Sequence, residues 1–435
     1  MYEMVKKTLT KICKMNKGMT MKKLQHIIMI ALILIGLATP ALAQDQTDSF
    51  NVAAKHAIAI ETTTGKVLYE KDATTPDGVA SMTKILTAYM VYKAVDQGKI
   101  TWDTEVGISD YPFNLTVDSE VSNVPLDSRK YTVKQLLDAT LISSANSAAI
   151  ALAEKISGTE STFVDTMTAQ LKEWGITDAK LFNASGLNNK YLGDNRYPGS
   201  KPDDENTMSA LDIAIIADHL IKDYPQVLEI TKQTEVDFEG DNKLTTHNYM
   251  LEGQENYREG VDGLKTGTTE LAGASFVAHS NENGMSLITV VMNAYNGGDD
   301  ESARFTATNE LLDYVTQNWE IKTLNTNGQI VKKNDIKVAD GDRKTISARL
   351  ESDLTVVQKI NSRNDSVKIQ AKTVTAPIKK GDTIGTAIYD DKDLVGTSYI
   401  SDPPQVDVTA NQSIKKSFFL KVWWNHILNF FTGNK

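Results

Sequence analysis

Cysteine is almost absent from this chain of 435 residues, whose single cysteine is Cys13. Thiol chemistry and disulfides therefore have at most one residue to draw on. Histidine is scarce too: none of the six histidines follows a His-x-x-x-His spacing, so zinc-peptidase chemistry lacks support. No Gly-x-Ser-x-Gly elbow occurs, which removes support for that type of hydrolase. A Ser-His-Asp triad, which sequence spacing does not reveal, is left open.

Long apolar runs are also lacking. The run at 27–38 falls short of the roughly 20 residues that a membrane-spanning helix needs. Seven lysines precede it, and Pro40-Ala41-Leu42-Ala43 after it forms a small-residue cleavage pattern. We therefore expect residues 1–43 to be a secretory signal peptide that is cleaved after Ala43, with an uncleaved membrane helix as the alternative. Alternative translation starts are Met15, Met19 and Met21.

The charge of the chain depends on this segment. Residues 1–43 carry +6, so their removal changes the formal net charge from −10 to −16. Such a negative charge argues against a nucleic-acid partner. Cys13 leaves with the segment, and nothing in the remaining sequence indicates a cofactor or a metal site. We therefore expect an exported protein that is stabilised by its apolar core.

The length of the chain suggests two domains and a distinct tail. Residues 45–320 combine helical and strand patterns, which predicts an α/β domain. Strands are expected at 52–71, 271–280 and 285–293, and helices at 81–96, 133–156, 160–174, 207–222 and 302–318. Residues 322–410 show short alternating runs instead, which predict a small all-β domain.

The tail, residues 412–435, has the composition of an amphipathic helix. On a helical wheel of residues 414–431, most apolar side chains, including Trp423 and Trp424, fall on one face. These 18 residues would reach about 27 Å as a helix and carry too many polar groups to span a bilayer. Tryptophan and lysine enrichment favours a helix that lies in the membrane interface. A helix that docks on the protein core is the alternative.

The candidate nucleophile is Ser81, in Ser81-Met82-Thr83-Lys84. Positions i and i+3 share a helix face, so Lys84 can reach the Ser81 oxygen. A buried lysine among cations can have a lowered pKa and act as a base. The helix N-terminus and the Ser81 N–H can stabilise developing negative charge. The tetrapeptide alone is weak evidence, because Ser413-Ile414-Lys415-Lys416 repeats the pattern in the tail.

Two further motifs raise the specificity of this assignment. Ser144-Ala145-Asn146 places a hydroxyl and an amide within an expected helix, where buried polar groups need partners. Lys265-Thr266-Gly267-Thr268 offers donors for a carboxylate, and Gly267 leaves room for a substrate backbone at a strand edge. Taken singly, each motif is equally compatible with an ordinary loop or a strand and turn.

The ordered set of Ser-x-x-Lys, Ser-x-Asn and Lys-Thr-Gly is typical of penicillin-binding proteins and β-lactamases. With Asn183-Ala184-Ser185-Gly186-Leu187 and Asp262-Gly263-Leu264-Lys265-Thr266-Gly267, the chain resembles the low-molecular-mass penicillin-binding proteins, the serine D-alanyl-D-alanine carboxypeptidases of peptidase family S11. The resemblance covers nearly the whole chain after the signal segment. It implies a β-lactamase-like catalytic domain with an antiparallel sheet flanked by helices, then a small all-β domain and a C-terminal amphipathic helix.

The resemblance also implies residue roles. Ser81 would be acylated by a peptidoglycan stem peptide ending in D-Ala-D-Ala, with Lys84 as base and Ser144 as proton relay. Asn146 would hold the substrate amide, and the N–H groups of Ser81 and Thr268 the oxyanion. Three side chains are expected to bind the terminal carboxylate, with Gly267 between them: Lys265, Thr266 and Thr268. β-Lactam antibiotics would acylate the same serine, and residues 412–435 would contact the outer face of the membrane.

Three other functions are compatible with the same sequence. A β-lactamase or a D,D-endopeptidase would use the same residues and differ in deacylation rate or in substrate. A surface scaffold or adhesin, with residues 322–410 as its binding module, belongs to a different class. The intact catalytic motifs argue against a scaffold as the only role.

Overall fold

A computed structural model describes residues 50–117, 120–331, 335–372 and 374–418. The expected signal peptide, residues 1–43, and most of the expected membrane helix therefore lie outside the described residues. The described residues from Val52 onward belong to one compact unit. In the part of the chain that the structure describes, no helix is both long and apolar enough to cross a membrane.

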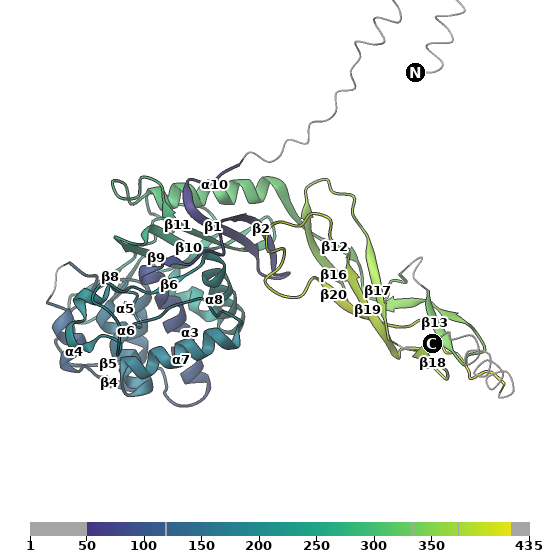
Figure 1. Cartoon of the computed structure of the whole chain (residues 1–435), viewed down its shortest axis with the longest axis horizontal. Helices are drawn as coiled ribbons and strands as arrows, with labels where there is room; N and C mark the ends of the chain where they lie inside the picture. The colour runs from purple at the N-terminus through teal and green to yellow at the C-terminus, as the bar shows by residue number, and fades with distance from the viewer. Residues whose placement is uncertain (1–49, 118–119, 332–334, 373, 419–435) are drawn as a thin grey trace, which may run out of the picture. The chain divides into compact units, whose positions relative to one another are not determined.

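A five-stranded antiparallel sheet organises the first part of this unit (Figure 1). Its strand order is β2-β1-β11-β10-β9, so β9 is an edge strand. The strands are β1 (Ala54–Glu61), β2 (Lys66–Lys71), β9 (Val261–Thr269), β10 (Gly273–Glu282) and β11 (Met285–Ala294). Their apolar runs are buried because helices cover the sheet. The predicted strands at 52–71, 271–280 and 285–293 are thus confirmed.

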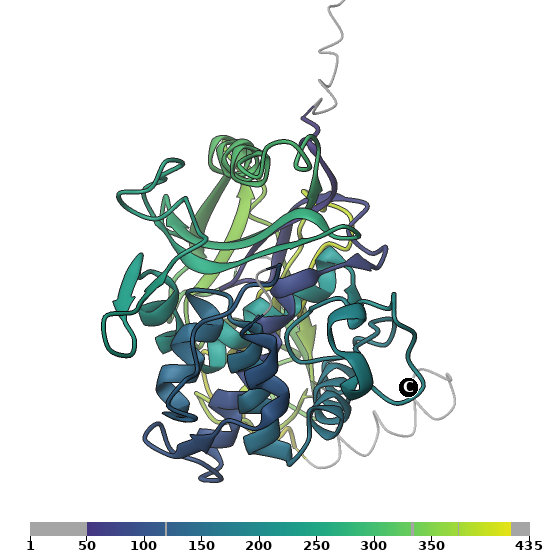
Figure 2. The same ribbon diagram turned by 90° about the vertical axis from the view of Figure 1, so that its left-hand side faces the viewer.

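Helices cover both faces of this sheet. Figures 1 and 2 show α10 (Ala303–Asn318) on one face and the other helices on the opposite face. The larger of these are α3 (Lys84–Asp96), α5 (Val133–Leu141), α6 (Asn146–Ser157), α7 (Glu160–Glu173) and α8 (Ala210–Asp223). Local sequence explains two starts, because Thr132 with Gln135 and Ser209 with Asp212 form capping boxes before α5 and α8. Most apolar side chains of these helices join one core with β1, β10 and β11.

Shorter elements complete this part and shape its loops. The helices are η1 (Ala80–Thr83), α4 (Asp110–Leu115), η2 (Asn189–Tyr191), η3 (Gly193–Asn195), η4 (Pro225–Val227) and α9 (Leu228–Thr231). Three antiparallel pairs join β3 (Asp77–Gly78) to β6 (Thr207–Met208), β4 (Glu105–Gly107) to β5 (Lys130–Thr132), and β7 (Glu235–Asp237) to β8 (Lys243–Thr245). Each of these pairs joins two loop segments that lie between the main helices and strands.

From Trp319 onward the described elements are all strands, as the alternating pattern predicted. Three sheets have the orders β12-β16, β14-β13-β18 and β15-β20-β19-β17. The second and third surround a separate apolar core, whereas β12 and β16 contribute to a smaller apolar cluster. The strands are β12 (Trp319–Asn325), β13 (Ile336–Ala339), β14 (Thr345–Ile346), β15 (Ala348–Leu350), β16 (Leu354–Lys359), β17 (Val367–Ala371), β18 (Val374–Thr375), β19 (Thr383–Tyr389) and β20 (Gln405–Ala410).

The structure corrects the expected start of the tail. Ile414 is buried in the β-rich core and pairs with Ile378, and Lys416 pairs with Gly341. Residues 412–416 therefore extend the β-rich domain and are not the start of an amphipathic helix. Residue 414 was included because it is apolar, although the sheet buries its side chain.

Candidate active site

Ser81 lies in η1 at the entrance to α3 and borders a cleft of about 290 Å³. Ala80, the preceding residue, has a φ of +44°, a conformation that side-chain-bearing residues rarely adopt. Such strain persists only where the surroundings hold it in place. The predicted single helix at 81–96 is thus a short 3₁₀ turn followed by α3, and the sharp bend sets the serine at the cleft.

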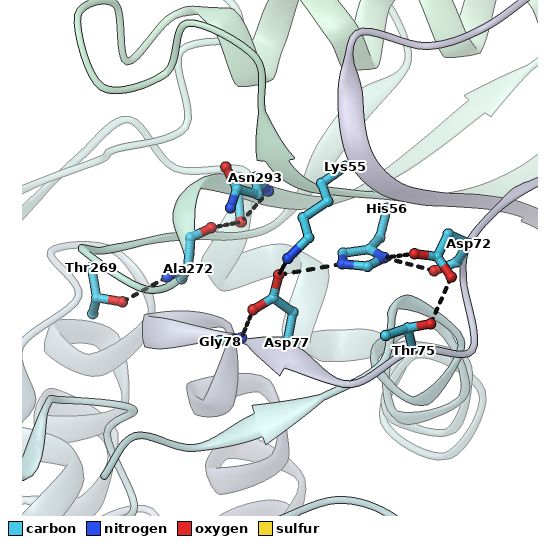
Figure 3. Close-up of polar contacts among 10 residues, drawn as sticks. Lys55, His56, Asp72, Thr75, Asp77, Gly78, Thr269, Ala272 and Asn293 are labelled. Atoms are coloured by element: carbon cyan, nitrogen blue, oxygen red, sulfur yellow. Dashed lines mark hydrogen bonds and ion pairs between the residues drawn. The ribbon is translucent and has the colours of Figure 1, made fainter. Parts of the chain in front are cut away.

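The segment that leads to the serine is fixed to the sheet by a polar network (Figure 3). Asp77 Oδ2 accepts a hydrogen bond from Lys55 Nζ at 2.7 Å, and His56 Nε2 lies 3.3 Å away. The other carboxylate oxygen accepts the N–H of Gly78 at 2.8 Å. His56 is fully buried on β1, and its Nδ1 lies 2.7 Å from the carbonyl oxygen of Asp72. These hydrogen bonds therefore hold the chain in place at Asp77, four residues before the nucleophile.

Lys84, the first residue of α3, meets Ser81 as the tetrapeptide predicted. Its Nζ lies 2.8 Å from Ser81 Oγ, 2.7 Å from Asn146 Oδ1 and 2.8 Å from the carbonyl oxygen of Ser185. Burial and then the charge of Lys265 lower the pKa of Lys84 well below its ordinary value. A neutral amine has two N–H donors and one lone pair, which match the two carbonyl oxygens and the Ser81 hydroxyl. The geometry therefore suits a base that takes the serine proton.

Ser144 and Asn146 lie where the predicted helix at 133–156 is interrupted. Helix α5 ends at Leu141 and α6 begins at Asn146, and Ser144 has a φ of +59°. The predicted single helix was therefore wrong, because residues 142–145 form a loop between α5 and α6. This loop places Ser144 in the wall of the cleft that Ser81 also borders.

Asn146 has a different environment from the one expected for a substrate amide ligand. Its Oδ1 faces Lys84 Nζ, and its Nδ2 donates to the carbonyl oxygen of Ser122 at 2.9 Å. Both ends of the side chain thus bond to protein atoms, and its exposed fraction is 3%. In the structure, Asn146 holds the base and does not face the open cleft.

The Lys-Thr-Gly motif lies on β9, the edge strand beside the nucleophile. Thr266 and Thr268 line the cleft, and Lys265 is buried with its Nζ 3.2 Å from the carbonyl oxygen of Thr266. The structure gives a further reason for the glycine at position 267. A Cβ there would lie 2.8 Å from the carbonyl oxygen of Val79, so the glycine admits the chain's own nucleophile segment.

Arg304 is the main site residue that the sequence did not reveal. It is 2% exposed on α10 and donates from Nη2 to Thr268 Oγ1 at 2.8 Å and from Nη1 to the carbonyl oxygen of Gly267 at 3.0 Å. A lone arginine in a helical pattern carries no signal of its role. The structure also adds further residues to the cleft wall: Glu120, Ser122, His247, Tyr249, Glu301 and Phe305.

Positive charge dominates the floor of the cleft. Burial and then Arg304 lower the pKa of Lys265 to about 7, and burial followed by Lys265 lowers that of His247 to about 4. Within residues 50–418 as described, the ion pairs include neither Lys84 nor Lys265. An entering carboxylate would therefore supply the missing counter-charge.

Comparison with known proteins agrees with this geometry. Residues 42–296 match the family Peptidase_S11, D-alanyl-D-alanine carboxypeptidase, and residues 319–416 match the C-terminal domain of penicillin-binding protein 5. D-alanyl-D-alanine carboxypeptidase DacF of Bacillus subtilis strain 168 is 30% identical over 411 residues, which are 92% of this chain and 96% of the relative.

Solved structures show the same architecture. The structure of a peptidoglycan synthesis regulatory factor (PBP3) from Streptococcus pneumoniae is 50% identical, with a TM-score of 0.76, and spans 84% of this chain and 100% of that one. Penicillin-binding protein 5 from Haemophilus influenzae is 25% identical, with a TM-score of 0.67, and spans 84% and 99%. Penicillin-Binding Protein D2 from Listeria monocytogenes in its ampicillin-bound form is 27% identical, with a TM-score of 0.51, and spans 61% and 98%.

Proposed function

Since this chain belongs to the family of D-alanyl-D-alanine carboxypeptidases, a family of serine peptidases, we propose that it cleaves the terminal D-alanine from peptidoglycan stem peptides through an acyl-enzyme on Ser81. The contact of 2.8 Å between Ser81 Oγ and the buried Lys84 Nζ carries this proposal. It joins a nucleophile to a base whose pKa is lowered by its surroundings.

The acylation step follows from these positions. Lys84 takes the proton of the Ser81 hydroxyl, and the oxygen attacks the carbonyl carbon of the penultimate D-alanine. The carbon–nitrogen bond then breaks, and the departing amine receives the proton through Ser144, which borders the same cleft. The N–H groups of Ser81 and Thr268 stabilise the oxyanion. Water hydrolyses the ester, which restores the serine hydroxyl and releases the shortened peptide.

Recognition of the free carboxylate of D-alanine falls to the positive end of the cleft. Thr266 and Thr268 present hydroxyls there, backed by Lys265 and by the guanidinium of Arg304. Lys265 forms no ion pair among the described residues, and it favours a ligand that ends in a carboxylate. β-Lactams carry a carboxylate at the corresponding place, and we expect them to acylate Ser81 in the same way.

Two assays with a matched control test the function. Wild-type protein should release D-alanine from a stem pentapeptide and become labelled by a fluorescent penicillin, whereas Ser81→Ala should do neither. Ser413→Ala removes the serine of the second Ser-x-x-Lys tetrapeptide and should retain both activities. Labelling of Ser81→Ala would refute the assignment. Rapid nitrocefin hydrolysis without D-alanine release would favour a β-lactamase instead.

Export and membrane association form a second part of the proposal. The basic segment and apolar run before Ala43 support export, and the tryptophans and lysines near the C-terminus support binding at the outer face of the cytoplasmic membrane. Because residues 412–416 belong to the β-rich domain, the anchor is narrowed to residues 419–435. Deletion of 419–435 should move the protein from the membrane to the soluble fraction; unchanged fractionation contradicts the anchor.

A further inference from the structure

Glu160 is a buried carboxylate that the acylation steps above do not use. It is the first residue of α7 and is 6% exposed. Its Oε1 accepts the backbone N–H of Ala184 at 2.8 Å, and its Oε2 accepts the hydroxyl of Tyr111 at 2.7 Å. Burying a carboxylate costs free energy unless the group is hydrogen-bonded. The two segments that supply its hydrogen-bond donors therefore bear on its role.

The first segment is the loop at 183–187, which lies behind the nucleophile. The carbonyl oxygen of Ser185 is one of the acceptors of Lys84 Nζ, at 2.8 Å. The neighbouring carbonyl of Ala184 accepts the hydroxyl of Thr87 at 2.6 Å. Gly186 has a φ of +79°, and a Cβ there would lie 1.8 Å from the carbonyl oxygen of Ala80. The loop therefore fits closely against the segment that carries Ser81.

The second segment begins at Tyr111 on α4 and continues to Ser122. The Ser122 carbonyl oxygen accepts both the backbone N–H of Asn146, at 3.0 Å, and its side-chain amide, at 2.9 Å. Asn146 Oδ1 is the other protein acceptor of Lys84 Nζ. The ring of Tyr111 packs against a small apolar cluster that contains Leu187. One acceptor of the base, the Ser185 carbonyl oxygen, thus lies on the loop that Glu160 binds, and the other, Asn146 Oδ1, is held by Ser122, eleven residues after Tyr111.

We propose that Glu160 is a positioning residue for the reaction, which holds the two acceptors of Lys84 in register through its hydrogen bonds to Ala184 and Tyr111. The inference rests on the proposed function, in which Lys84 is the base that deprotonates Ser81. It assigns to Glu160 no contact with substrate.

The surroundings of Glu160 allow its hydrogen bonds to persist over a range of pH. Burial raises its pKa to about 7, while the Ala184 N–H and the Tyr111 hydroxyl lower it and the charge of Glu154 on α6 raises it. A protonated carboxyl can still accept from Ala184 and can donate to the phenol oxygen, because a hydroxyl is both donor and acceptor. A glutamine at this position has the same capacity. Hydrogen bonding, and not charge, is therefore the property to test.

The test compares variants by pre-steady-state acylation with a fluorescent penicillin, with rates expressed per labelled site. Glu160→Ala should lower the limiting acylation rate constant about tenfold or more and shift its midpoint in pH, because the partners of Lys84 are displaced. The dissociation constant of the non-covalent complex should change less than about twofold, because Glu160 is not among the residues that line the cleft. Glu160→Gln should stay within about threefold of wild type at every pH.

Two further variants separate positioning from stability. Gln170→Ala removes another buried polar side chain of α7, whose partners are Lys93 and Glu173, and should leave the acylation rate constant unchanged. Tyr111→Phe keeps the ring in its apolar cluster but removes the hydrogen bond from the hydroxyl to Glu160, which is one of the two that Glu160 accepts. It should lower the acylation rate constant about threefold. This milder variant keeps the test open if Glu160→Ala does not fold.

The outcomes distinguish the inference from the function on which it rests. The inference is overturned if Glu160→Ala acylates at the wild-type rate per labelled site and with the wild-type pH midpoint, even if its melting temperature falls. If Glu160→Ala does not fold, the same result for Tyr111→Phe overturns the inference. Failure of Glu160→Gln to restore the rate overturns it as well. Absence of labelling in the wild-type protein overturns the proposed function, and the inference with it.

Discussion

Two regions of the molecule bury lysine side chains and use them in opposite ways. In the cleft, Lys84 and Lys265 are buried near each other, and Arg304 lies near Lys265. Neither lysine forms an ion pair with a carboxylate among the described residues. Lys66 on β2 is equally buried, but its Nζ lies 2.7 Å from Asp391 Oδ2. It also donates to the carbonyl oxygen of Val357 at 2.9 Å.

The difference shows what a carboxylate partner does to a buried lysine. Burial lowers the pKa of Lys66, but the hydrogen bond and charge of Asp391 oppose the shift. The ring of Trp319 adds a cation–π contact, with its centroid 4.6 Å from Nζ. The cleft lysines have no carboxylate partner that would raise their pKa again. Lys84 can therefore be a neutral amine and act as a base. Lys66 instead links β2 to the strands of the β-rich domain.

The largest expected effect comes from removing the base. Lys84→Met should lower the acylation rate about 10³-fold, because among the described side chains Lys84 is the one that is hydrogen-bonded to Ser81 Oγ. Its melting temperature should fall only modestly, because the substitution removes a buried amine that has no carboxylate partner but leaves Asn146 Oδ1 and the Ser185 carbonyl oxygen without their donor. Stopped-flow acylation and differential scanning calorimetry measure both. A large loss of stability would contradict the claim that Lys84 lacks compensation.

At Lys66 the same substitution should have the opposite consequence. Lys66→Met leaves Asp391, which is 4% exposed, without its cation and should cost about 3–5 kcal/mol of stability. Acylation per folded molecule should be unchanged. Denaturant unfolding measures the loss, and the double variant Lys66→Met with Asp391→Asn should recover part of it. Equal costs for the single and double variants would show that packing, and not the ion pair, is what was lost.

Glu160 extends the comparison to a buried acid without a cation. Its pKa is raised from 4.5 to about 7, so the folded state prefers its protonated form. The contribution of Glu160 to the free energy of unfolding is therefore largest below pH 4.5. It decreases by up to about 3 kcal/mol as the pH rises to about 7. Glu160→Gln should remove this decrease. Urea unfolding at pH 5 and pH 8 measures it; equal pH dependence in both proteins would place the titration elsewhere.

The smallest effect concerns the charge of Lys265. Its pKa of about 7 means that its charge is present below neutral pH and is lost above it. Binding of a terminal carboxylate should therefore weaken as the pH rises, and kcat/KM should fall by up to about tenfold per pH unit above the pKa. Lys265→Arg, which stays charged, should lack this fall. An identical alkaline limb in both proteins would assign it to another group.

The sequence predicted the chemistry of the cleft better than its surroundings. Ser81 and Lys84 meet because three residues along a helical turn suffice, and that relation is local. The break at residues 142–145, in contrast, depends on how α5 and α6 pack, and the propensity of a few residues does not decide it. Ile414 was assigned to the tail because an isolated apolar residue does not show from sequence whether it belongs to a helix or to a β core.

Residues that act across long sequence separations left no local pattern. Arg304 reaches Thr268 from a helix 36 residues further along, and Glu160 reaches Ala184 from a distance of 24 residues. Single charged residues in helical segments normally face solvent, so their burial was not expected. Gly267 was identified correctly as a close approach, but only the tertiary structure shows that Val79 is its neighbour.

Peptide mapping of the penicillin-treated protein tests the central claim most directly. Wild-type protein treated with a penicillin should gain the mass of one opened β-lactam, carried by the peptide that contains Ser81. Lys84→Met protein treated for the same time should carry almost none. An adduct on another residue, or equal labelling of the Lys84→Met protein, would contradict a nucleophile at Ser81 that is activated by a buried, uncompensated lysine.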